Sequence, residues 1–83
     1  MTMHGFRVSI DDQVFLADRD EEIGAVRQVN PDHIVVYIEN AGDFLVYGPQ
    51  VKAAHDGKVI LDPAKVEPKL LQAAQTAHER ETD

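Results

Sequence analysis

The distribution of the β-branched residues valine and isoleucine constrains the fold of this chain most. Fourteen of its fifteen valine and isoleucine residues precede residue 62, in short runs that glycine, proline, asparagine and aspartate separate. Such runs are typical of strands joined by tight turns. The first three quarters of the chain are therefore predicted to be all-β.

The positions of the strands follow from apolar alternation and from turn residues between the runs. In residues 33–39, the side chains of Ile34, Val36 and Ile38 share one face, which is predicted to face the core, and Tyr37 lies on the opposite face. Residues 6–10 are a candidate for a short first strand. The other expected strands are 14–17, 23–29, 33–39, 44–47, 51–55 and 58–61.

The dipeptide Asp56-Gly57 is the strongest local turn signal, since apolar-bearing arms flank it on both sides. Both central residues of a type I′ turn need positive φ, which Asp-Gly tolerates, so residues 51–61 are predicted to form a β-hairpin. Five to six short strands in a flat sheet would leave exposed edges. A small barrel or a strongly bent sheet is therefore expected.

The last quarter of the chain is predicted to be helical. Asp62-Pro63 favours one helical turn around residues 64–66, and residues 69–80 contain neither glycine nor proline. We therefore expect a barrel domain over residues 1–67 and a helix with a polar tail over 68–83. A stripe at helical spacing either covers the open end of its own barrel or packs against a second copy; it contains Leu70, Ala73, Ala74 and Ala77, with Leu71 beside it.

Composition excludes several classes of partner and location. Eight Lys and Arg residues against fifteen Asp and Glu residues give a net charge of −7, which repels phosphate backbones and predicts that the protein binds no nucleic acid. The longest apolar run, residues 34–38, is too short to insert into a membrane. Because the chain has no cysteine to stabilise a secreted domain of this size, we expect a cytoplasmic protein.

No motif predicts catalysis, a cofactor or a metal site. His78-Glu79 begins like a zinc-protease motif, but Thr82 stands where the second histidine ligand is needed. The acidic turn at residues 18–22 begins like a calcium loop, but Ile23 and Val29 occupy the positions that need glycine and glutamate. The protein is therefore predicted not to be an enzyme and to need no cofactor.

The order of the runs as a whole resembles the PRC-barrel family, the small barrel of the photosynthetic reaction centre H subunit and of a ribosome-maturation factor. The similarity spans roughly residues 10–66 and is carried by residues 22–29, 33–36, 43–46, 51–53 and 56–62. It implies a partly open, SH3-like barrel of six strands that serves as an adaptor for other proteins without cofactor chemistry.

We therefore expect a non-enzymatic protein–protein interaction module that forms a homodimer and binds a further protein. Tyrosine is enriched in interfaces, which makes Tyr37 and Tyr47 candidate binding residues. Leu70, Leu71 and Ala74 are the candidates on the helix. The alternative is a barrel that senses a small ligand or an ion through its acidic turn or its histidines.

Overall fold

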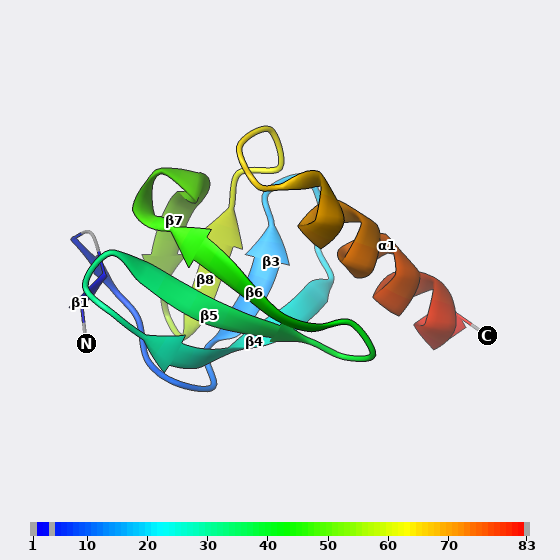
Figure 1. Ribbon diagram of the computed structural model, residues 1–83, viewed down its shortest axis with the longest axis horizontal. Helices are drawn as coiled ribbons and strands as arrows, with labels where there is room; N and C mark the ends of the chain where they lie inside the picture. The colour runs from blue at the N-terminus through cyan, green and yellow to red at the C-terminus, as the bar shows by residue number, and fades with distance from the viewer. Residues whose placement is uncertain (1, 4, 83) are drawn as a thin grey trace.

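The computed structural model describes residues 2, 3 and 5–82, and the side chains of residue 3 and of residues 5–75. Six of its strands form one mixed sheet in the order β6-β5-β4-β3-β8-β7, and two N-terminal strands form a separate ladder (Figure 1). The elements are β1 Thr2–Met3, β2 Phe6–Arg7, β3 Gln13–Leu16, β4 Glu22–Val29, β5 His33–Ile38, β6 Gly42–Tyr47, the 3-10 helix η1 Gly48–Gln50, β7 Val51–His55, β8 Lys58–Leu61 and the helix α1 Pro68–Thr82.

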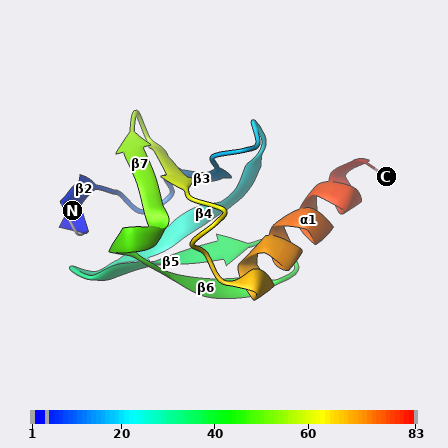
Figure 2. The same ribbon diagram turned by 90° about the horizontal axis from the view of Figure 1, so that it is seen from above.

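The sheet bends into a half-barrel. Strands β3 and β8 pair in parallel, whereas the other neighbouring strands of the described sheet pair antiparallel. Figure 2 shows β7 standing at a steep angle to β5 and β6, so that the two ends of the sheet do not lie in one plane. The prediction of a mainly β protein with a partly open, barrel-like sheet and a C-terminal helix is confirmed.

The N-terminal segment differs from the prediction. Strand β2 ends at Arg7 and pairs with β1, so residues 6–10 do not form one strand. The chain turns instead: the Ser9 N–H donates to Asp12 Oδ2 at 2.8 Å, and the Asp12 N–H donates to Ser9 O at 3.1 Å. Asp11 adopts a φ of 77° within this turn. These local hydrogen bonds compete with a ladder and end the strand early.

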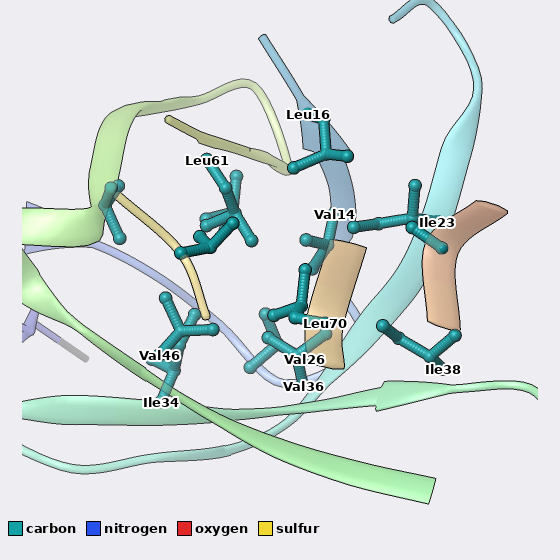
Figure 3. Close-up of a cluster of buried hydrophobic side chains, with 14 of the residues drawn as sticks. Val14, Leu16, Ile23, Val26, Ile34, Val36, Ile38, Val46, Leu61 and Leu70 are labelled. Atoms are coloured by element: carbon teal, nitrogen blue, oxygen red, sulfur yellow. The ribbon is translucent and has the colours of Figure 1, made fainter. Parts of the chain in front are cut away.

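The core lies inside the bend of the sheet. As the alternation predicts, Ile34, Val36 and Ile38 are fully buried, and Tyr37 between them is exposed. Side chains from both halves of the sheet meet there, including Val36 of β5 and Leu61 of β8 (Figure 3). Among the described residues, the buried side chains are all hydrophobic. Burial of these apolar side chains supplies the main favourable free energy of folding.

Helix α1 covers one end of the half-barrel. Asp62 accepts a hydrogen bond from the Ala64 N–H through its Oδ1 at 2.9 Å, which closes the predicted turn before the helix. The stripe then packs on this chain's own core, because Leu70 lies among core side chains of β4 and β5 (Figure 3). Ala77 has no described side chain. Neither α1 nor any other described helix has the length and apolarity that crossing a bilayer requires.

The hairpin at Asp56-Gly57 provides a direct test of the turn geometry. His55 pairs with Lys58, and the two residues between them have φ values of 54° and 75°, as the type I′ prediction requires. A β-branched residue at positive φ is strained, so Gly57→Val should lower the free energy of unfolding by more than about 1 kcal/mol. Gly57→Asn, which tolerates this conformation, is the matched control. Equal urea midpoints for the two variants would contradict the type I′ turn at Asp56-Gly57.

Gly24 allows β4 and β5 to approach each other closely. A methyl group added here would overlap the carbonyl oxygen of Tyr37 and lie 3.2 Å from Ile38 Cγ1. Since a ladder backbone cannot shift cheaply, Gly24→Ala should destabilise the fold by about 1–3 kcal/mol in urea unfolding. Ala25→Ser adds one atom at the neighbouring position and should cost much less. A Gly24→Ala variant as stable as the wild type would show that the strands have room to separate.

Candidate functional site

The outward side of the β5–β6 hairpin carries an apolar surface, which we call the outer hairpin face. It is formed by three pairs of directly opposite residues on adjacent strands. Residues opposite one another in an antiparallel ladder lie on the same face, with their Cβ atoms in contact range. The pairs are His33 with Tyr47, Val35 with Leu45, and Tyr37 with Asp43.

Exposure distinguishes this face from the rest of the described surface. Among the described residues, four large hydrophobic side chains are exposed, and three of them belong to the face: Tyr37 at 37%, Leu45 at 48% and Tyr47 at 44%. The fourth, Ile10, lies in the loop after β2. Single exposed hydrophobic residues are common on soluble proteins, whereas a contiguous group marks a contact surface.

A β-bulge in β4 places Arg27 beside Tyr37 and Asp43, at one end of the outer hairpin face. The register with β5 shifts between Val26 and Gln28, so Arg27 has no direct partner in the ladder. The Arg27 guanidinium lies 4.8 Å from the centroid of the Tyr37 ring, and its Nη1 lies 3.0 Å from Asp43 Oδ1. An exposed ion pair of this kind adds less than about 1 kcal/mol to stability. Its effect is to hold the Tyr37 ring beneath a cation.

The other end of the face is organised around His33. Its Nδ1 lies 2.7 Å from Asp32 Oδ1, its Nε2 lies 3.2 Å from Asn30 Nδ2, and its ring centroid lies 5.4 Å from that of Tyr47. The hydrogen bond with His33 is the main reason that the pKa of Asp32 is lowered from its usual value. These contacts anchor the Tyr47 ring to the adjacent strand.

The five predicted binding residues do not lie on one surface. Tyr37 and Tyr47 are together on the outer hairpin face, on neighbouring strands. Leu70 and Ala74 are buried at 1% exposure each in this chain's own core, and Leu71 is half-buried against it. The helix stripe thus matches the alternative in which α1 covers its own barrel, and these buried side chains are not presented to a partner.

The alternation of residues 33–39 places Val35 on the outward side with Tyr37, although the sequence did not single it out as a binding residue. Sequence reasoning missed Leu45 as a member of the face. Residues 44–47 are uninterrupted apolar residues, so either phase of alternation fits them equally well. The pairing of Leu45 with Val35 decides the phase, and only the sheet register reveals it. A useful signal was available in Tyr37, whose outward position implies an outward row on the neighbouring strand.

The outer hairpin face offers apolar side chains, bordered by polar ones, for contact with another molecule. Among the described residues, no three histidine, aspartate or glutamate side chains gather where one metal ion would bind all of them. The face provides aromatic and aliphatic area, with the Arg27–Asp43 pair at one end and the Asp32–His33 pair at the other. Apolar area bordered by polar groups is the usual anatomy of a protein interface.

Comparisons of the chain with protein-family models, with curated proteins and with solved structures each found no match.

The Asp32–His33 contact predicts a specific pH dependence. A carboxyl whose pKa is lowered by folding stabilises the folded state at pH values above its unfolded pKa, and this contribution is lost as the pH falls through the folded pKa. We expect NMR titration to show Asp32 ionising below the usual range for aspartate, and His33→Ala to raise that midpoint. The control His55→Ala, at another Asp–His contact, should leave it unchanged. An unaltered Asp32 midpoint in His33→Ala would contradict this cause.

Proposed function

We propose that this protein is a non-enzymatic interaction module that binds another protein through the outer hairpin face. The observation that carries the proposal is the contiguous exposed row formed by Tyr37, Leu45 and Tyr47. Leaving such side chains in water forgoes about 25 cal/mol for each Å² of apolar area, which a partner would recover by covering them. A strand face with no binding role would usually be polar on its solvent side.

The arrangement of the aromatic rings supports a binding role. The Tyr37 ring is held by Arg27 and the Tyr47 ring by His33, so both are positioned before a partner arrives. Preorganised side chains lose less conformational entropy on binding, which leaves more of the contact energy as affinity. Tyrosine also offers a large apolar area together with a hydroxyl for a hydrogen bond.

We further propose that the sheet is a PRC-type barrel and that the protein is cytoplasmic. A six-stranded, partly open sheet is what the resemblance to PRC-barrel adaptors leads one to expect, and we assign the chain to this type. The net charge of −7 and the absence of cysteine favour a cytoplasmic module that binds proteins and not nucleic acid.

Capture of partners by the purified chain with matched variants tests the proposal. Tyr37→Ala removes a ring from the face, whereas Ile10→Ala removes an exposed apolar side chain away from it. We expect a partner that is retained by the wild type and by Ile10→Ala, and whose affinity for Tyr37→Ala is about tenfold or more weaker. A partner bound equally by all three chains would place binding elsewhere.

A further inference from the structure

Strand β6 forms one edge of the sheet, and part of its backbone faces outward. In an antiparallel ladder, the backbone groups of successive residues point to alternate sides. The Asn30 N–H donates to His33 O at 2.9 Å, so the groups of His33 face β4 and those of Ile34 face β6. Its partner Val46 therefore faces β5, and the neighbouring Leu45 directs its N–H and C=O to the open side.

The length of this free edge is limited at one end. The Tyr47 N–H also lies off the ladder, and it donates to Gln50 Oε1 at 2.8 Å. By the same alternation, the remaining outward groups of β6 belong to Asp43 and Leu45. In Figure 1, β6 crosses in front of the other strands of the sheet.

The two edge strands of the sheet, β6 and β7, differ in the features that prevent pairing with a strand of another chain. The edge strand β7 has a register shift between Val51 and Ala53 and lies against β2. Strand β6 pairs with β5 over six consecutive residues without a shift, and it contains neither lysine nor proline. Bulges, charged side chains (lysine above all), proline and covering segments are the usual means of preventing edge-to-edge pairing. Of these, the described strand β6 has one charged side chain, Asp43, and neither a register shift, a lysine nor a proline.

We propose that β6 pairs antiparallel with β6 of a second copy of this chain, about a two-fold axis at Phe44. This register places Asp43 of each copy opposite Leu45 of the other, so that the free donors and acceptors match. Tyr47 keeps its hydrogen bond to Gln50. The pairing goes beyond the proposed function, since it depends on the backbone edge and not on a further partner.

The charges on β6 are compatible with this register. Asp43 is the single charged residue of the strand, and its Oδ1 lies 3.0 Å from Arg27 Nη1 of its own chain. Like charges would be opposed only in a register centred on Asp43. The net charge of −7 on each copy still produces long-range repulsion, which salt screens. Salt should therefore strengthen the pairing.

A second copy suits this edge better than a flexible peptide does. A peptide must lose backbone entropy to become a strand, whereas β6 of another copy is already formed. Phe44, which packs against the core, would lie opposite Phe44 of the second copy, and cross-strand aromatic pairs are favourable. Because the sheet continues across the axis, the two outer hairpin faces would join into one larger binding surface.

Light scattering on the purified chain alone tests the pairing separately from any binding to other proteins. We expect the wild type to approach twice the 9.2 kDa chain mass as its concentration rises, and at lower concentrations when salt is added. Leu45→Lys places a charge on the edge and should halve that mass while circular dichroism stays native. The control Ile10→Lys should remain dimeric. A wild-type monomer at every concentration, or a dimer in Leu45→Lys, would overturn the proposal; the first result would leave the edge to an extended segment of another protein.

Cysteine cross-linking tests the register, since the chain has no cysteine of its own. In the proposed register, Asp43 and Leu45 of the two copies have Cα atoms about 5.5 Å apart, within the range of a disulfide. Mixing Asp43→Cys with Leu45→Cys should therefore give the cross-linked heterodimer on oxidation. Leu45→Cys alone should cross-link no faster than Ile10→Cys, because the offset of two residues along the strands, added to the spacing between strands, puts its two Cα atoms more than about 7 Å apart. Faster cross-linking of Leu45→Cys alone would overturn the register centred on Phe44.

Discussion

The parallel pairing of β3 with β8 holds the whole sheet together. It joins Gln13 to Lys58 and Leu16 to Leu61, residues that are far apart in the chain, whereas the other described sheet contacts join consecutive strands. Without it, β3 to β6 and the β7–β8 hairpin would be two separate antiparallel units. The pairing lets Val14 and Leu61 reach one core, which lies on the concave side of the sheet near the helix.

Helix α1 completes that core because its backbone lies close to the sheet, and not because it contributes many large side chains. Leu70 is its main buried side chain, and Ala73 and Ala74 beside it bury little area but allow the helix backbone to lie near the sheet. The helix therefore belongs energetically to the same folding unit as the strands. The described side chains of its stripe pack against the core of the same chain. The candidate surface for association is therefore the β5–β6 hairpin and not the helix stripe.

The β5–β6 hairpin supports two different tasks on its two faces. Its inner side contributes Ile34, Val36 and Val46 to the core, so its geometry is tied to the stability of the fold. Its outer side presents an apolar row, and its edge presents unpaired backbone groups. A binding face supported by a rigid, buried scaffold keeps its shape when the partner is absent, which lowers the entropy cost of recognition.

Features that depend on neighbouring residues could be predicted from the amino-acid sequence alone. The type I′ turn at Asp56-Gly57, the alternation that exposes Tyr37 and the helical stripe all follow from local backbone and side-chain geometry. The outward position of Leu45 and the burial of Ala74 became known only from the folded chain. A continuous apolar run has no preferred phase, and a stripe does not identify the surface that it covers. Both are decided by contacts between segments distant in the chain, because apolar burial is non-directional and selects a partner only through the geometry of the complete fold.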